Sequence, residues 1–107
     1  MSEAARIVRP KGRLDSNTGP AFEVELVAII DAGIERVLLD FSELIYISSA
    51  GLRVVLLAAK RMKASNRRFA LCSLNAQIAE VFKISGFDAI IDIHPSPDSA
   101  MAHLASS

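Results

Sequence analysis

The stretch LLDFSELIYISSAGLRVVLLAAKRM, residues 38–62, joins an apolar run to a helical pattern through two adjacent serines. Its first residues belong to the run Arg36–Phe41. This run is apolar with charged ends, which is typical of a strand buried on both faces. From Ser48 or Ser49 onwards, apolar residues recur at helical spacing as far as Met62. The stretch therefore predicts a buried strand, a short connection, and a helix whose first turn carries both serines.

Strands and helices continue to alternate on both sides of this stretch. Further strands are predicted from Arg6–Pro10 through Lys11 and Gly12 into residues 13–15 (broken or bulged near Pro10), at Arg68–Ser73 and at Ala89–His94. Further helices are predicted to start in Ser16–Pro20 and stop at Gly33, to run from Asn75 to Gly86, and to start at Ser96.

This alternation predicts an α/β sandwich, a single domain over residues 1–107. We expect a mixed, mostly parallel sheet of about four or five strands covered by about four helices. The apolar segments VLLDF (37–41), FALC (69–72) and AIID (89–92) are expected in one sheet, because they are too apolar for an exposed face.

Composition argues against several classes of protein. Twelve basic and twelve acidic residues cancel, so nothing draws the whole chain to nucleic acid or to an anionic membrane. Cys72 is the only cysteine, and with His94 and His103 it forms no zinc spacing, so we expect neither a disulfide nor a metal site. No apolar stretch reaches the roughly 18–20 residues that span a bilayer, and residues 1–15 lack the apolar core of a signal peptide. We expect a soluble cytoplasmic domain without membrane insertion and without a cofactor.

The serine pair allows three interpretations. A hydroxyl that caps the helix stabilises it by about 1 kcal/mol, which accounts for one serine but not for two. A nucleophile elbow needs the pattern G-x-S-x-G, whereas Ile47 precedes Ser48 and no histidine is near in sequence, so we do not expect an enzyme. A phosphoacceptor suits the position best, because a helix N-terminus tolerates a phosphate whose charge of roughly −2 changes a partner surface.

Residues 38–62 resemble the STAS domain, as found in bacterial anti-sigma-factor antagonists. In that family a strand ends in an aspartate, a short apolar link follows, and a serine precedes Gly-Leu at the start of a helix. The segment GRLDSNT (12–18) resembles the first loop of the family, and residues 70–94 resemble its later strand, helix and strand. The resemblance covers nearly the whole chain.

The resemblance implies a phosphoacceptor serine. Counting back from Gly51-Leu52 places Ser49 at the position that takes the phosphate in the family. Ser48 stands where the family has an aspartate, and Ala50 stands at a second hydroxyl position. These two departures leave Ser48 as a competing site.

The resemblance also implies a partner-binding surface, made of Asp15, Ser16, Ser48, Ser49, Gly51, Leu52 and Arg53. Asp15 matches a loop aspartate that lies near the phosphoacceptor in the family, although a cap or Asx-turn is an equally good interpretation. Gly51 stands in the first helical turn, where alanine is ordinarily favoured by up to about 1 kcal/mol. We expect glycine to be kept there so that a partner can approach the backbone. On that view Gly51→Ala weakens partner binding and leaves thermal stability equal or higher.

The function implied is that of an anti-sigma-factor antagonist in a partner-switching cycle. The unphosphorylated protein would bind an anti-sigma factor that is also a serine kinase, which frees a sigma factor, and a serine phosphatase would reset the cycle. ATP belongs to the kinase in this scheme. One alternative is a STAS subunit that docks on the ATPase of a membrane transporter complex. Another is a nucleotide- or anion-binding module that uses the helix start at Ser48–Gly51.

Asp40 and a basic run stand outside the serine motif. A response-regulator receiver would also end a strand in a phosphoaccepting aspartate. Residues 6–14 lack the acids and residues 90–97 lack the lysine that a receiver needs, so Asp40 is predicted to accept backbone donors in the following turn.

Between Glu43 and Glu80 there is no acid, but six cations occur: Arg53, Lys60, Arg61, Lys63, Arg67 and Arg68. They fit either the C-terminal end of a helix dipole or a basic patch for an acidic partner, with nucleic acid disfavoured.

Overall fold

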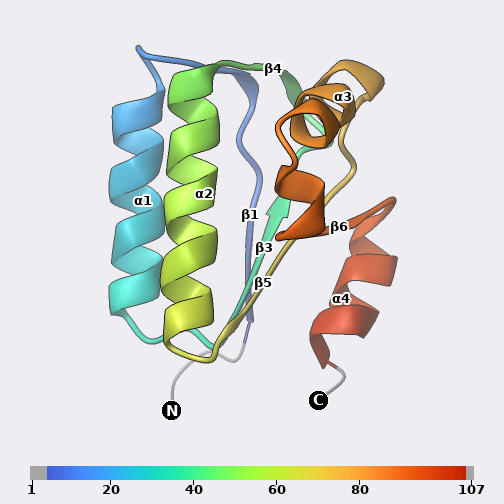
Figure 1. The fold of residues 1–107 in the computed structure, drawn as a ribbon. Coiled ribbons are helices and arrows are strands. Elements are labelled where there is room, and N and C mark those ends of the chain that lie inside the picture. The colour runs from blue at the N-terminus through green and yellow to red at the C-terminus, as the bar shows by residue number, and fades with distance from the viewer. Residues whose placement is uncertain (1–4, 106–107) are drawn as a thin grey trace.

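The computed structural model describes residues 5–105. Its main sheet has the strand order β1-β3-β5-β6, and each neighbouring pair is parallel. The strands are β1 (Ala5–Val8), β3 (Arg36–Asp40), β5 (Arg68–Cys72) and β6 (Asp92–His94). Helices α1 (Gly19–Asp31) and α2 (Ser49–Ala64) lie side by side on one face, and α4 (Pro97–Ala105) lies against the other (Figure 1).

A second, smaller sheet lies at one end of the molecule. Strands β2 (Gly12–Leu14) and β4 (Leu44–Ile47) pair in parallel, and α3 (Ala76–Ile84) with the 3-10 helix η1 (Phe87–Ala89) packs beside them. The predicted fold class is confirmed: an α/β sandwich with a parallel sheet and four α-helices in the described part of the chain.

The hydrophobic core has two parts because strand side chains alternate between the faces of the main sheet. Leu38, Ala70 and Cys72 face α4, where they meet Ala100 and Leu104. Because three of these five side chains are as small as alanine or cysteine, α4 can pack close to the strands. The larger part lies under the helices of the opposite face and contains the buried residues Phe22, Leu26, Val37, Leu39, Val55, Met62, Phe69 and Leu71.

The helices begin and end where the sequence predicts. In α1, Pro20 stands in the first turn, and Gly33, with a φ of 82°, follows the end of the helix. Helix α2 begins directly after Ser48, and Asn75 caps α3 by accepting the N–H of Ile78 at 2.8 Å.

The last predicted strand, Ala89–His94, is wrong in its first half. The 3-10 helix η1 ends at Ala89, after a turn in which Gly86 adopts a φ of 77°, and Ile90 and Ile91 follow as a turn and a bend. The N–H of Ile91 donates to the carbonyl of Phe87 at 2.9 Å, so this backbone donor is used within the turn and not in the sheet. Of the three segments expected in one sheet, the first two are there, but the third contributes only Asp92.

One short strand was not predicted, and one predicted strand is divided. The strand expected from Arg6 into residues 13–15 is broken near Pro10 as predicted: its first part ends at Val8, and Gly12–Leu14 forms a separate strand in the other sheet. Leu44–Ile47 was expected to be a connection, but it pairs with Gly12–Leu14. Neither strand is long enough to establish a period in sequence.

Asp40 is the one buried charged residue among residues 5–105, with 2% of its surface exposed. Its Oδ2 lies 2.8 Å from Nε of Arg9, and its Oδ1 accepts the N–H of Ser42 at 3.0 Å. Burial alone would raise the pKa of Asp40, but the Arg9 guanidinium and the Ser42 donors outweigh it and hold the pKa below its ordinary value. The predicted role of Asp40 in the turn after β3 is confirmed.

Replacing Asp40 tests this ion pair through stability. Because the pKa of Asp40 is lower in the folded state than the ordinary 3.8, its contribution is present above that value and is lost as pH falls through the folded pKa. Asp40→Asn keeps an acceptor for Ser42 but removes the charge facing Arg9. We expect it to lower the free energy of unfolding by about 1–3 kcal/mol near neutral pH, and by less in acid.

Urea unfolding at several pH values measures this difference. Glu80→Gln is the control, because Glu80 is exposed on α3, and it should follow the parent protein at every pH. Equal stability of Asp40→Asn and the parent at neutral pH would refute a stabilising role for the pair.

Candidate functional site

Ser48 and Ser49 have different roles at the junction of β4 and α2. Ser48 is the N-cap of α2, with extended backbone, and its Oγ accepts the N–H of Gly51 at 3.4 Å. Its carbonyl accepts the N–H of Leu52 at 2.9 Å. Ser49 is the first helical residue and is exposed, whereas Ser48 is half-buried. One hydroxyl is therefore engaged in capping the helix, and the other residue faces solvent.

The loop that contains Asp15 lies beside this helix start. Leu14 is paired with Ile47 in the small sheet, and the carbonyl of Leu14 accepts the N–H of Ser48 at 2.9 Å. Since β2 and β4 are parallel, their carboxyl ends meet at the same edge. The structure thus brings Asp15 and the serine pair to one end of the small sheet, as the sequence resemblance implies.

Asp15 itself shapes its loop. Its Oδ1 accepts the N–H groups of Asn17 at 2.9 Å and Thr18 at 3.2 Å, and Oγ1 of Thr18 accepts the N–H of Asp15 at 2.9 Å. The N–H donors of Thr18 and Asn17 hold the pKa of Asp15 below its ordinary value, and the nearby Arg13 acts in the same direction. Asp15 therefore forms the Asx-type turn that was one of its two predicted roles. Ser16 is exposed in the same loop.

An apolar rim that sequence reasoning missed borders the serines. On β4, Ile45 is 61% exposed and Tyr46 is 40% exposed. The guanidinium of Arg13 lies 4.2 Å from the centre of the Tyr46 ring, and the two residues are partners in the strand register. Exposed aliphatic and aromatic side chains of this kind are typical of contact surfaces. We call Arg13, Asp15, Ile45, Tyr46 and Ser49 the β4–α2 surface.

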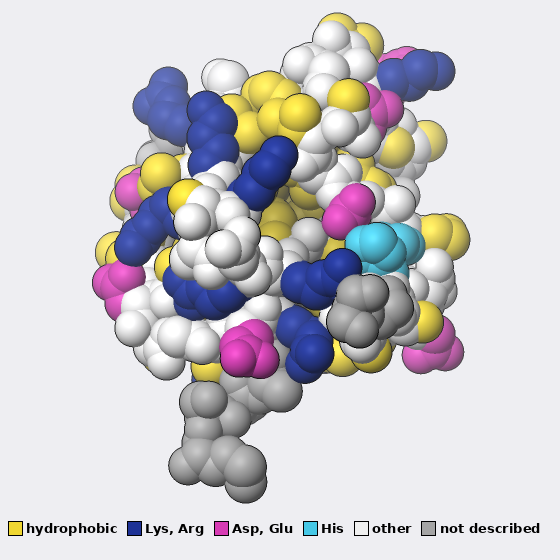
Figure 2. Space-filling model, turned by 60° about the horizontal axis from the view of Figure 1, so that its bottom comes forward, with side chains coloured by type: hydrophobic (Ala, Val, Ile, Leu, Met, Phe, Trp, Pro, Cys, Tyr) yellow, Lys and Arg dark blue, Asp and Glu magenta, His cyan; other side chains and the backbone are white. Residues whose placement is uncertain are grey.

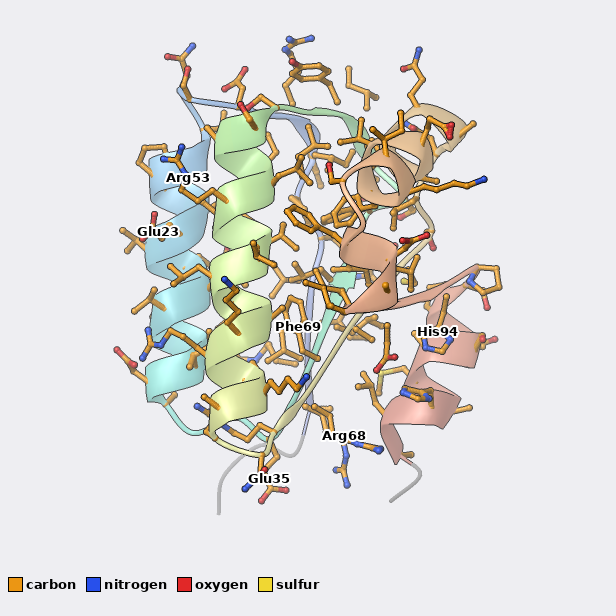
Figure 3. All side chains as sticks on the ribbon, viewed as in Figure 1. Glu23, Glu35, Arg53, Arg68, Phe69 and His94 are labelled. Carbon is orange, nitrogen blue, oxygen red and sulfur yellow. The ribbon has the colours of Figure 1, made fainter. Side chains whose placement is uncertain are left out.

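The remaining predicted contact residues differ in exposure. Arg53 is exposed one helical turn after Ser49, near the N-terminal end of α2 on the side next to α1 (Figure 3). Leu52 is partly buried and packs against the core. Arg53 is therefore available to a partner at the edge of the β4–α2 surface, and Leu52 also serves the fold.

Gly51 is buried, and its place is set by internal packing. A Cβ atom at this position would lie 2.6 Å from the carbonyl oxygen of Leu14 and 2.9 Å from Cγ1 of Ile47. Real Cβ atoms do not approach backbone oxygens that closely, so a side chain would push α2 away from the small sheet. The expectation that Gly51→Ala leaves stability equal or higher is wrong, because the chain itself fills the space.

The helix start is electrostatically suited to an added negative charge. The first turn of α2 contains no acidic residue, and its backbone N–H groups carry the positive end of the helix dipole. Within residues 5–105, no group of three or more His, Cys, Asp and Glu side chains is arranged to hold a metal ion. In the same residues, no helix combines the length and the apolar character needed to cross a bilayer.

Comparison with known proteins gives consistent matches. The model of the STAS domain family matches residues 2–100. The protein named "Putative anti-sigma factor antagonist BtrV", from Bordetella bronchiseptica, is 45% identical over 92 residues, which are 86% of this chain and 79% of that protein.

Three of the solved structures that share the fold cover most of this chain. A "putative anti-sigma factor antagonist" from Thermotoga maritima superimposes with a TM-score of 0.93 at 22% identity, covering 99% of this chain and 92% of that one. The anti-sigma factor antagonist SpoIIAA in its unphosphorylated form has a TM-score of 0.80 at 19% identity, covering 95% and 89%. Its phosphorylated form, described as a Bacillus cell fate determinant, has a TM-score of 0.75, also at 19% identity, covering 95% and 92%.

Gly51→Ala tests the packing of α2 on the small sheet. The gain in helix propensity, up to about 1 kcal/mol, is opposed by an overpacking penalty of about 1–3 kcal/mol, because the contact atoms include a backbone oxygen that cannot rotate away. We expect a net loss of stability and a lower melting temperature.

Val24→Ala is the control, since Val24 is 70% exposed in the middle of α1, and alanine there raises helix propensity without a close contact. Thermal unfolding of both variants should show Val24→Ala equal to or more stable than the parent and Gly51→Ala less stable. If both gained stability alike, the close approach at Gly51 would be refuted.

Proposed function

The chain belongs to the STAS domain family, and on this premise we propose that it is an anti-sigma-factor antagonist controlled by phosphorylation of Ser49. It acts in the cytoplasm by binding, and the catalytic step belongs to its partners. The observation that carries the proposal is the exposed Ser49 at the N-terminus of α2, next to the Asp15 loop and the apolar side chains of β4. The name of the relative that is 45% identical supports it.

Ser49 is favoured over Ser48 as the phosphoacceptor. A kinase must reach the hydroxyl, and Ser49 is exposed, whereas the Oγ of the half-buried Ser48 accepts the N–H of Gly51. A phosphate on Ser49 would stand at a helix N-terminus without an acidic neighbour in the first turn, which favours negative charge. The solved phosphorylated form of SpoIIAA supports the idea that this fold tolerates a phosphate.

The charge of the phosphate would act on a surface that combines apolar side chains with an ion pair. Ile45 and Tyr46 offer apolar area, and the Arg13 guanidinium already faces the Tyr46 ring and the Asp15 carboxylate, 3.6 Å from its Oδ2. A partner that covers Ser49 would have to desolvate a charge of roughly −2 after phosphorylation.

A partner-switching cycle follows from this difference. The unphosphorylated protein binds an anti-sigma factor that is a serine kinase and thereby releases a sigma factor. The kinase uses its own ATP to modify Ser49, the complex dissociates, and a serine phosphatase restores the binding form.

Substitutions at the two serines test the switch. Ser49→Asp should fold normally, because a carboxylate at a helix N-terminus stabilises by roughly 0.3–1 kcal/mol, but it should lose affinity for the anti-sigma factor. Ser49→Ala should keep binding and resist the kinase, and Ser48→Ala should still be phosphorylated. The measurements are calorimetric binding and mass-spectrometric mapping after incubation with the purified kinase and ATP.

Three results would contradict the proposal. They are phosphate on Ser48 in the parent protein, a Ser49→Asp variant that binds as tightly as the parent, and co-purification with the ATPase of a membrane transporter in place of an anti-sigma factor.

A second substitution tests the apolar rim. Ile45→Thr keeps a β-branched side chain on β4 but removes apolar contact area, so stability should change little while affinity for the anti-sigma factor falls at least fivefold. Val24→Thr is the control, because Val24 is 70% exposed on α1, outside the β4–α2 surface, and it should bind like the parent. Equal affinity of all three proteins in calorimetry would exclude Ile45 from the interface.

A further inference from the structure

A groove of about 660 Å³ lies on the side of the molecule seen in Figure 2. One wall is the C-terminal half of α2, and the other is the segment from the end of η1 to the start of β6. Phe69 of β5 lies between these walls (Figure 3), with Leu56 and Ala59 of α2 beside it. Figure 2 shows a hollow with a hydrophobic floor and several dark blue cationic side chains around it. Since Ser49 starts α2, this groove lies toward the opposite end of the helix.

The groove exposes apolar surface as well as charged side chains. Ile90, on the wall opposite α2, is 57% exposed, and Ile91 beside it is 4% exposed. An exposed isoleucine next to a concave apolar floor offers area that a ligand can cover. A volume between about 300 and 1,000 Å³ is typical of small-molecule sites.

The rim of the groove carries positive charges that no ion pair neutralises within residues 5–105. Lys60 and Lys63 line the α2 wall one turn apart, both are exposed, and neither forms an ion pair within residues 5–105. Arg67 is already engaged, since its Nη1 donates to the carbonyls of Ile30 at 2.8 Å and Ile34 at 3.2 Å.

Among residues 5–105, Asp92 is the one acid that lines the groove, and its carboxylate already has a partner. Its Oδ2 lies 3.1 Å from Nε2 of His103. The groove therefore combines an apolar floor with two lysines that can meet a negative group.

We propose that this groove binds a small amphipathic carboxylate, with the carboxylate between Lys60 and Lys63 and the aliphatic body on Phe69 and Ile90. The apolar floor distinguishes this ligand from a simple inorganic anion, and the lysines distinguish it from a neutral hydrocarbon. The two walls enclose a space of ligand size, whereas a protein partner ordinarily covers about 800 Å² of a flatter surface. The site is separate from the β4–α2 surface, so this proposal does not depend on the phosphorylation of Ser49.

The test is a titration of the isotope-labelled protein with octanoate, followed by amide NMR shifts. We expect saturable shifts at residues 56–63, 69 and 90–92. Acetate supplies the charge without the aliphatic body, and octanol supplies the body without the charge, so each should bind at least fivefold more weakly than octanoate. Shifts that do not saturate, or that acetate or octanol reproduces at equal concentration, overturn the proposal.

Variants locate the site. A protein with Lys60→Ala and Lys63→Ala should bind octanoate about fivefold more weakly or worse, because exposed ion pairs contribute up to about a factor of five each. Ile90→Ser should also weaken binding. Lys11→Ala is the control: Lys11 is exposed before β2 and does not line the groove, so it should bind like the parent.

Melting temperatures close to that of the parent establish that the groove variants are folded. If the double lysine variant binds octanoate as the parent does, the assignment of the carboxylate is refuted. If the groove amides shift on raising the protein concentration alone, a second copy of the chain occupies the groove and the proposal is wrong.

Discussion

The contact between the N-terminus of α2 and the carbonyl of Leu14 is the constraint on which the rest of the site depends. This one oxygen accepts the N–H of Ser48 at 2.9 Å and also stands where a side chain at residue 51 would have to go. Only glycine satisfies both conditions without moving the helix. Because Leu14 ends β2 and Ser48 follows β4, the same contact brings the Asp15 loop, the exposed side chains of β4 and Ser49 to one place.

The elements predicted correctly are those whose sequence pattern is long and whose burial is uniform. Arg36–Asp40 is buried over four of its five residues, and α2 repeats its apolar face over four turns. Leu44–Ile47 has only its two end residues buried, a pattern that is neither alternating nor continuous, and it becomes a strand only by pairing with Gly12–Leu14. That pairing joins segments far apart in the chain, which no local pattern encodes.

Burial without strand pairing explains the error at the last strand. Ile91 is 4% exposed, as the apolar run predicts, but it is buried by packing after a 3-10 turn. The hydrophobic pattern therefore predicted the burial of Ile91 correctly but not its backbone conformation. The same distinction applies at Gly51, where the sequence shows that a side chain is absent, but only the fold shows that Leu14 and Ile47 take up the space.

At the candidate site, local rules predicted the capping of α2, and tertiary contacts decided the rest. Asp15 was predicted either to shape its loop or to face a partner, and it makes its turn with Oδ1 while Oδ2 faces Arg13 at 3.6 Å. Asp15 therefore shapes its loop with one oxygen and contributes the other to the β4–α2 surface. Tyr46 and Arg13 contact each other because they are register partners, which again needs the unpredicted strand pair.

The proposed switch needs no rearrangement of the domain. Helix α2 is held along its length by Gly51, Val55 and Met62, and the last two are fully buried, so a charge on Ser49 has little freedom to move the helix. The helix dipole stabilises such a charge by about 0.3–1 kcal/mol, whereas burying it without a matching cation under a partner costs several kcal/mol. The second effect is larger and arises only in the complex. Phosphorylation of Ser49 would therefore leave the fold almost unchanged and act on the affinity, which is what a reversible partner switch requires.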